Sequence, residues 1–266
     1  MLKIGIVGLG AIGRGICHEL SLDELHLLVV AVSSRNRRKA ENFLKSLKRP
    51  PPWVLQSDLI GSSDLVVEAS GGQEVPQLAE NVFNAGKDLL IISVGALLQR
   101  LDLIERARLE GRKLYIPTGA IVGLDGVKSA MAGRVDRVIM TTRKPPRGLV
   151  GAPYLVDNGI SVSELTEPKV VFEGNALEAA RGFPENVNVC AGLSLAGVGP
   201  VKTQIRIVAD PALVRNMHRF EVEGEAGRFE IQIENIPTEN PKTGKLTAMS
   251  IVATLRGIVN PLSVGT

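Results

Sequence analysis

Residues 2–13 read LKIGIVGLGAIG: a short apolar run leads directly into Gly8-Leu9-Gly10-Ala11-Ile12-Gly13, which has the spacing GxGxxG. The pattern predicts a strand over residues 3–7, a tight turn at Gly8 and a helix over residues 11–20. In that context Gly8 permits the turn, Gly10 lets a pyrophosphate approach the backbone, and Gly13 lets helix and strand pack closely. Ala11 and Ile12, at the helix N-terminus, complete the candidate phosphate cradle. The stretch predicts dinucleotide binding; the alternative is a domain of this fold that has lost its ligand.

The first 117 residues continue the same alternation. Further apolar runs predict strands at residues 27–33, 65–69, 89–94 and 114–116, and amphipathic segments predict helices at residues 37–47, 75–85 and 101–110. Strands that are apolar almost throughout are typical of a parallel sheet covered on both faces. We therefore predict an α/β fold whose residues 1–117 form a Rossmann-like, doubly wound parallel sheet.

After residue 117 the pattern changes to strands with more polar alternation, predicted at residues 135–143, 168–173 and 203–209. Residues 219–223 and 228–234 flank Gly224-Glu225-Ala226-Gly227 and predict an antiparallel hairpin. The sequence thus predicts a second α+β domain with a mainly antiparallel sheet over residues 118–239. An amphipathic helix over residues 242–256 predicts that the segment 240–266 returns to the dinucleotide-binding domain.

Composition excludes several classes of function. The 31 Lys and Arg against 28 Asp and Glu leave a net charge of only +3, and six Phe, two Tyr and one Trp are too few aromatics for a base-stacking nucleic-acid binder. Two cysteines make neither a disulfide framework nor a metal site. No apolar run reaches the length of a membrane span, and we read the N-terminus as a strand and not a signal peptide. We expect a cytoplasmic protein without nucleic-acid or membrane partners and without a metal.

The end of the predicted second strand bears on the cofactor. An Asp or Glu at this place commonly binds the ribose hydroxyls of NAD, but residues 33–38 read SSRNRR, without an acid. Ser34 and Arg35 can bond a 2′-phosphate, and Arg37 and Arg38 add positive potential. We therefore expect NADP or NAD as cofactor, with NADP accepted. The alternative is that these arginines are only the solvated start of the next helix.

Of the three histidines, His218 is the candidate for chemistry. It shares strand parity with Phe220 and Val222, so its side chain is expected to point inward or into a cleft. Imidazole titrates in the range that suits general acid–base catalysis. A core histidine with satisfied hydrogen bonds is the alternative interpretation.

The chain resembles the L-aspartate dehydrogenase family over nearly its whole length. The resemblance is carried by an ordered set of motifs that generic Rossmann enzymes lack. Beside the glycine loop these are Ser93-Val94-Gly95-Ala96, Gly119-Ala120-Ile121, Arg143-Lys144-Pro145, Asn186-Val187-Asn188-Val189, Leu193-Ser194-Leu195-Ala196-Gly197, Ala209-Asp210-Pro211, the His218 segment and Asn240-Pro241-Lys242-Thr243.

The resemblance implies oxidation of L-aspartate to iminosuccinate, with hydrolysis to oxaloacetate and ammonia or delivery to NAD biosynthesis. It implies that His218 is the acid–base residue, that Ala120 and Asn188 contact the cofactor, and that residues 118–239 form a catalytic and dimerisation domain of a homodimer. For the two carboxylates of that substrate we choose Lys144 and the helix start at Lys242 and Thr243 as candidate ligands.

Two other functions stay open. One is a related two-domain oxidoreductase acting on another amino acid or dicarboxylate, of the homoserine dehydrogenase or dihydrodipicolinate reductase kind. The other is a dinucleotide-sensing protein without catalysis.

Overall fold

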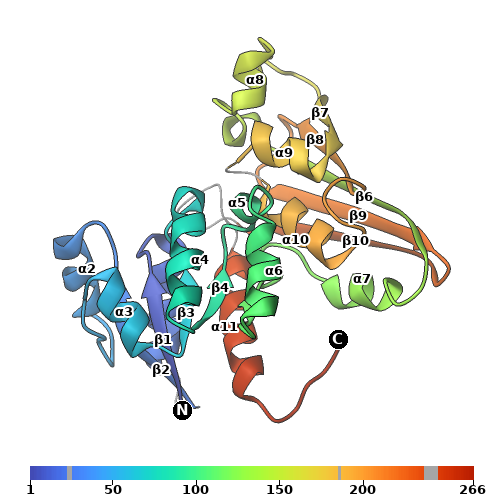
Figure 1. Ribbon diagram of the computed structural model, residues 1–266. Coiled ribbons are helices and arrows are strands. Elements are labelled where there is room, and N and C mark those ends of the chain that lie inside the picture. The colour runs from blue at the N-terminus through green and yellow to red at the C-terminus, as the bar shows by residue number, and fades with distance from the viewer. Residues whose placement is uncertain (23–25, 185–186, 237–244) are drawn as a thin grey trace. The chain divides into compact units, whose positions relative to one another are not determined.

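The computed structural model describes residues 1–22, 26–184, 187–236 and 245–266. The chain separates into two compact units, Met1–Pro117 with Thr247–Ser263, and Thr118–Leu246 with Val264–Thr266. Each unit contains one five-stranded sheet, and the two sheets confirm the predicted fold class (Figure 1).

The first unit is built on a parallel sheet of strand order β2-β1-β3-β4-β5. Its helices and strands, including the helix from the C-terminal part of the chain, are β1 (Leu2–Val7), α1 (Ala11–Leu22), β2 (Leu27–Ser33), α2 (Arg37–Leu44), α3 (Gln56–Ser62), β3 (Leu65–Glu68), η1 (Gly72–Glu74), α4 (Val75–Asn84), β4 (Asp88–Ile91), α5 (Val94–Leu97), α6 (Asp102–Leu109), β5 (Leu114–Tyr115) and α11 (Lys245–Val259).

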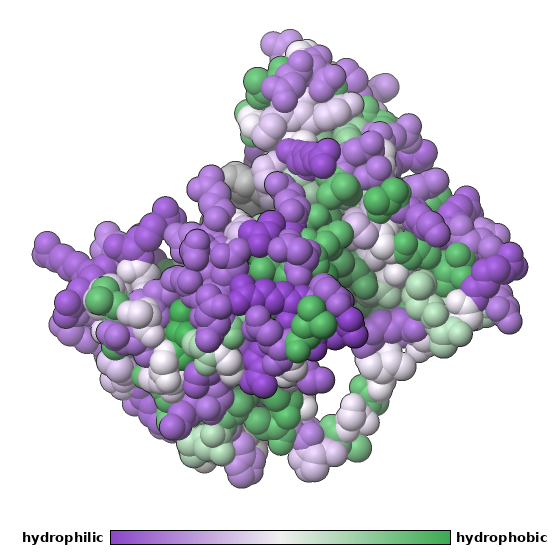
Figure 2. Space-filling view, viewed as in Figure 1, coloured by the Kyte–Doolittle hydropathy of each residue, from purple (hydrophilic) through white to green (hydrophobic). Residues whose placement is uncertain are grey.

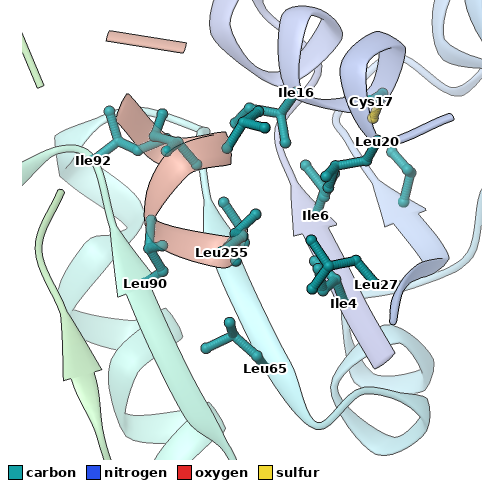
Figure 3. Close-up of a cluster of buried hydrophobic side chains, with 14 of the residues drawn as sticks. Ile4, Ile6, Ile16, Cys17, Leu20, Leu27, Leu65, Leu90, Ile92 and Leu255 are labelled. Carbon is teal, nitrogen blue, oxygen red and sulfur yellow. The ribbon is translucent and has the colours of Figure 1, made fainter. Parts of the chain in front are cut away.

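One hydrophobic core joins both ends of the chain within this unit. Ile16, Cys17 and Leu20 of α1 pack on the apolar strands, and Ile251 and Leu255 of α11 belong to the same buried cluster. Figure 3 shows Leu255 among side chains of β1, β3 and β4. Burial of a full aliphatic side chain contributes about 1.5–3 kcal/mol, so α11 is fixed to the parallel sheet chiefly by its apolar face.

The outer side of this unit is charged. Arg100 pairs with Glu80 of α4 at 2.8 Å, and Arg106 pairs with Glu110 at 2.7 Å. Figure 2 shows hydrophilic residues over α4 and α6 on the side that faces the viewer. Helices that bury one stripe and solvate the other are what the amphipathic segments predicted.

The second unit carries the mainly antiparallel sheet, of strand order β10-β9-β6-β8-β7, in which only β6 and β8 are parallel. Its elements are α7 (Leu124–Ala130), β6 (Val135–Lys144), η2 (Pro146–Gly148), α8 (Pro153–Asp157), β7 (Lys169–Asn175), α9 (Ala176–Gly182), α10 (Asn188–Ala196), β8 (Gln204–Ala209), β9 (Asn216–Gly224) and β10 (Gly227–Asn235). The β9–β10 hairpin confirms the predicted turn, with Gly224 opposite Gly227.

Helices α7, α9 and α10 cover one face of this second sheet (Figure 1). The residues that face them are buried and mostly apolar, for example Val138 and Met140 of β6 and Phe220 and Val222 of β9. The opposite face is polar: Arg219 of β9 pairs there with Glu230 of β10 at 2.6 Å. This alternation places every second residue of β6 and β9 beneath the helices.

Three boundaries differ from the sequence prediction, and one helix had not been predicted. Strand β4 ends at Ile91, because the next two backbone N–H groups, of Ile92 and Ser93, donate to the carboxylate of Glu68 and turn the chain. Strand β6 extends by one residue to Lys144. Helix α3 was not predicted at all. Helix α11 runs through Gly257 to Val259, and the predicted start at 242–244 lies outside the described residues.

Candidate active site

The glycine loop of the first unit behaves as its spacing predicts. Gly8 has a φ of +102°, and a Cβ there would lie 2.3 Å from the carbonyl oxygen of Ala69. A Cβ on Gly13 would lie 2.0 Å from the carbonyl oxygen of Gly8, so the start of α1 passes directly against the turn. A Cβ on Gly10 would meet nothing within 4 Å. Two glycines are therefore needed for packing, while the third faces open space where a phosphate can approach.

The open space at Gly10 belongs to a pocket of about 510 Å³ at the carboxyl ends of β1 and β2. Its walls come from the glycine loop, the β2–α2 connection, the segment 53–56 and the loop after β3. The residues that line it are Val7, Gly8, Leu9, Gly10, Ser33, Ser34, Arg35, Asn36, Lys39, Ala40, Trp53, Leu55, Gln56, Ala69, Ser70 and Glu74. A crevice outside the carboxyl ends of parallel strands is where such sheets bind ligands.

The β2–α2 corner of this pocket carries a buried polar atom without a partner. Within the described residues the hydroxyl oxygen of Ser34 is inaccessible and makes no hydrogen bond. Arg35 and Lys39 line the same corner, while the side chain of Asn36 accepts from the backbone N–H of Lys39 at 2.9 Å and caps α2. A buried hydroxyl normally has a partner. This corner therefore fits a ligand that brings hydrogen-bond acceptors and negative charge.

The arginines predicted here divide into two groups. Arg35 lines the pocket, but Arg37 and Arg38 are not among the lining residues. Arg37 pairs with Glu41 at 2.8 Å and lies over the ring of Trp53, 4.9 Å from its centroid. Lys39, which was not predicted from the sequence, also lines the pocket. It lies in the first turn of α2, whereas Arg35 lies just before the N-cap Asn36.

A buried carboxylate ties the loops of the pocket together. Glu68, the last residue of β3, is fully buried. It accepts from the backbone N–H groups of Ser70, Gly71, Ile92 and Ser93 at 2.8–3.2 Å, and from the hydroxyls of Ser70 and Ser93. Such an anion stabilises both chain reversals at once, after β3 and after β4. An acid ending an otherwise apolar strand was the sequence signal for it.

His218 lies in the second unit, on the face of β9 that the helices cover. It is 3% exposed, which confirms the inward parity predicted from Phe220 and Val222. Its Nδ1 lies 3.1 Å from Oγ1 of Thr142, the residue directly opposite on β6. In the described part of the chain its Nε2 makes no hydrogen bond. The ring is thus held at one nitrogen and free at the other.

A buried lysine shares this face. Lys144 is the last residue of β6. It lies two positions after Thr142, so its side chain points to the same side of the sheet, and it is 4% exposed. Burial, and then the positive charge of Lys144, lower the pKa of His218 to about 3. Arg143 points to the opposite side and pairs with the buried Asp210. Lys144, the predicted carboxylate ligand, therefore belongs to the His218 site, and the neighbouring Arg143 does not.

Cys190 completes the cluster from α10. Burial raises the pKa of its thiol to about 11, while the charge of Lys144 and the hydroxyl of Thr142 act in the opposite direction. Asn188, two residues earlier, begins the same helix. Ala120 precedes α7, and its carbonyl oxygen accepts from Nδ2 of the buried Asn235 at 2.9 Å. Three residues of this region were not predicted from the sequence: Thr142, Cys190 and Asn235. Only strand pairing and helix packing bring Thr142 and Cys190 to His218, and Asn235 to Ala120.

The remaining predicted residues have the following places. Gly8, Gly10, Gly13, Ser34 and Arg35 lie together in the first unit, while His218 and Lys144 lie together in the second. The cofactor contacts of Ala120 and Asn188 stay predictions. Lys242 and Thr243 lie outside the described residues. Among the residues that are described, no three His, Cys, Asp or Glu side chains are grouped to hold a metal ion, and no helix is long and apolar enough to cross a bilayer.

Both parts of the chain match families of known proteins. Residues 125–258 match the family described as "Aspartate dehydrogenase, C-terminal" and residues 8–117 the one described as "Homoserine dehydrogenase, NAD binding domain". The L-aspartate dehydrogenase of Bradyrhizobium diazoefficiens is 47% identical over 266 residues, covering 100% of this chain and 94% of that protein. The chain belongs to the L-aspartate dehydrogenase family.

Other members of the L-aspartate dehydrogenase family show the same full-length match. The enzyme of Methanosarcina mazei is 44% identical over 271 residues, with 100% of both chains covered. The crystal structure of aspartate dehydrogenase from Thermotoga maritima superposes with a TM-score of 0.77 at 26% identity, again with both chains covered completely. This family member is therefore an oxidoreductase with NAD or NADP as cofactor. The glycine loop and the corner of the pocket at Ser34 fit such a cofactor.

Proposed function

We propose that this protein oxidises L-aspartate to iminosuccinate, with His218 as the acid–base residue and Lys144 as a ligand of a substrate carboxylate. The observation that supports the assignment is the buried imidazole of His218, whose Nε2 has no hydrogen-bond partner among the described residues, beside the buried Lys144. NAD or NADP, when bound, accepts a hydride from the substrate's Cα. The protein has to bind the dicarboxylate, exclude water and move a proton at the nitrogen or at the attacking water.

The electrostatics of the His218 site suit an anionic amino acid. The positive charge of Lys144, which is 4% exposed, attracts a substrate carboxylate to this site. Burial is the main cause of the low pKa of His218, and the charge of Lys144 is the second; the same carboxylate offsets this second cause. Substrate binding therefore raises the basicity of His218, so that the imidazole becomes a competent proton acceptor when the substrate is present.

The assay that tests the reaction follows the absorbance of the reduced nicotinamide. Purified protein is given L-aspartate with NAD or with NADP, and in parallel homoserine and other amino acids. Reduction with L-aspartate, and oxaloacetate and ammonia as products, is the expected result. Reduction with homoserine in preference to L-aspartate would support the related-oxidoreductase alternative, and dinucleotide binding without turnover would support the sensor.

We propose further that the pocket accepts the 2′-phosphate of NADP at Ser34, Arg35 and Lys39. The partnerless hydroxyl of Ser34 and the two cations of the corner support this choice. Aspartate or glutamate at the end of β2 would repel that phosphate, and residues 33–38 contain none. NAD remains a substrate, because the glycine loop binds the pyrophosphate that both cofactors share.

The family resemblance supports a proposal for the oligomeric state, and the two cysteines support one for the cellular location. We propose a homodimer, which sedimentation velocity tests directly. We also propose a cytoplasmic location, since both cysteines are free, buried thiols, as is usual in a reducing compartment. Fractionation of the source cell tests the location. Delivery of iminosuccinate to NAD biosynthesis stays a prediction.

A further inference from the structure

The hydroxyl of Thr142 lies between two other buried groups. Its oxygen is 3.1 Å from Nδ1 of His218, and the same hydroxyl lowers the pKa of the neighbouring Cys190 thiol, against the larger effect of burial. Thr142 itself is 1% exposed, so water does not compete for the hydroxyl. A hydroxyl has one hydrogen to donate, and a neutral imidazole has one protonated nitrogen. The direction of the hydrogen bond between Thr142 and His218 therefore decides which nitrogen of His218 carries the proton.

Two directions are self-consistent. In the first, Nδ1–H of His218 donates to Oγ1 of Thr142, and the hydroxyl donates to Sγ of Cys190. The lone pair of Nε2 is then free to accept a proton. In the second, the thiol donates to the hydroxyl, which donates to Nδ1, and Nε2 carries the proton. Since Nε2 makes no hydrogen bond in the described part of the chain, it is the nitrogen available to a substrate or water.

The charged state of His218 separates the two directions. When the imidazole gains its second proton, at Nε2 in the first direction or at Nδ1 in the second, both ring nitrogens become donors. The first direction already provides Nδ1–H with an acceptor, whereas the second would leave two hydrogens pointing at each other. Burial keeps the thiol of Cys190 neutral and protonated, so its sulfur can accept from the hydroxyl as a weak partner. Only the first direction therefore allows proton uptake without rearranging a buried group.

We propose that Thr142 is a positioning residue that holds His218 in the tautomer protonated at Nδ1, with Cys190 accepting the threonine hydroxyl. The proposal rests on the proposed acid–base role of His218. Thr142 does not touch the reacting atoms; it acts through the ring that it orients.

Imidazole nitrogen NMR of full-length protein labelled at histidine tests the tautomer directly. The protein contains three histidines. The resonances that are missing from the spectrum of His218→Asn are those of His218. In the wild type we expect the Nδ1-protonated tautomer of His218. A wild-type spectrum of the Nε2-protonated tautomer would overturn the proposal, whatever the variants do.

Thr142→Val and Thr142→Ser separate the hydroxyl from the shape of the residue. Valine keeps the branched shape and removes the hydrogen bond, so we expect a shift toward the Nε2-protonated tautomer and a loss in kcat on the order of 10- to 100-fold. KM for L-aspartate and Kd for the cofactor should stay unchanged, and serine should restore both tautomer and kcat. Equal losses in the two variants, or wild-type kcat in Thr142→Val, would refute the positioning role.

Failure of the proposed function gives a different result. If His218→Asn keeps its turnover, the acid–base assignment is wrong, but the tautomer measurement in the wild type still reports the direction of the Thr142 hydrogen bonds. A melting curve shows whether Thr142→Val folds. If it does not, the wild-type spectrum and the tautomer and kcat of Thr142→Ser test the positioning role of Thr142.

Discussion

Lys144 and His218 lie on the same buried face of the neighbouring strands β6 and β9, and the ammonium of one depresses the pKa of the other. Burial alone already disfavours the imidazolium, and Lys144 adds a second cause in the same direction. A base that is weak in the free enzyme and stronger once an anion has bound is suited to a dicarboxylate substrate.

Replacing Lys144 with methionine should raise the pKa of His218 above its value of about 3. The imidazole then becomes protonated at higher pH, so the acid limb of the kcat/KM profile moves to higher pH. KM for L-aspartate should also rise, because a carboxylate ligand is lost. Titration of the His218 ring resonances checks the first effect and steady-state kinetics the second. A pKa that falls in Lys144→Met would contradict the electrostatic assignment.

The same depressed pKa makes stability depend on pH. Between about pH 6.5, the ordinary value, and about pH 3, the unfolded chain binds a proton at His218 that the folded chain does not. Stability is therefore lost as pH falls through this window. In His218→Asn the urea midpoint should decline less between pH 6.5 and 4 than in the wild type, measured by circular dichroism. An equal decline in both proteins would show that His218 contributes nothing to acid sensitivity.

Substitution of the catalytic candidate itself should separate chemistry from binding. His218→Asn should lower kcat by about 10²- to 10⁴-fold, the usual contribution of general acid–base catalysis. Cofactor Kd should not change. His18→Asn is the matched control, because His18 is an exposed residue of α1 whose side chain is 60% accessible. Near-wild-type kcat in His218→Asn would remove this residue from the mechanism.

The cofactor corner predicts a selective effect. Arg35→Ala and Lys39→Ala should each weaken NADP binding by about tenfold, the loss of one charge-assisted hydrogen bond, and leave NAD binding nearly unchanged. Arg38→Ala is the control, since Arg38 is not among the residues that line the pocket. Quenching of Trp53, the single tryptophan and a pocket residue, gives the Kd values. Parallel losses for both cofactors would argue against a 2′-phosphate subsite.

Two glycines of one motif should respond in opposite ways. Gly13→Ala places a Cβ against the carbonyl of Gly8 and should cost about 1–3 kcal/mol of unfolding free energy. Gly10→Ala meets no protein atom, so stability should be retained while both cofactors bind more weakly. Chemical unfolding and the fluorescence titration measure the two effects. Unchanged cofactor binding in Gly10→Ala would show that the phosphate does not approach there.

Glu68 should prove essential to the first unit. Glu68→Gln keeps the shape but turns an amide N–H₂ group toward N–H donors, and we expect a loss of about 2–4 kcal/mol. Glu105→Gln removes an ion pair with Arg108 that is exposed and screened by solvent, so its free energy of unfolding should stay close to that of the wild type. Urea unfolding of both variants decides. Similar small losses would mean that the six hydrogen bonds of Glu68 contribute little net stability.

Much of this architecture follows from the chain's local pattern. The apolar run before Gly8 and the spacing of the three glycines determine a strand, a turn and a helix, because only glycine fits where backbone passes backbone. The parity of His218 with Phe220 and Val222 likewise determines that the ring points inward, since strand side chains alternate.

Local sequence pattern could not determine which residues far apart in the chain come into contact in the fold. Thr142 and His218 are 76 residues apart, and they become partners only through the register of β6 and β9. Glu68 meets Ile92 and Ser93 only because β3 and β4 are neighbours. Lys144 enters the site because β6 is one residue longer than predicted. Sequence periodicity specifies which face a side chain takes; strand order and register, set by packing of the whole unit, specify which side chains that face brings together.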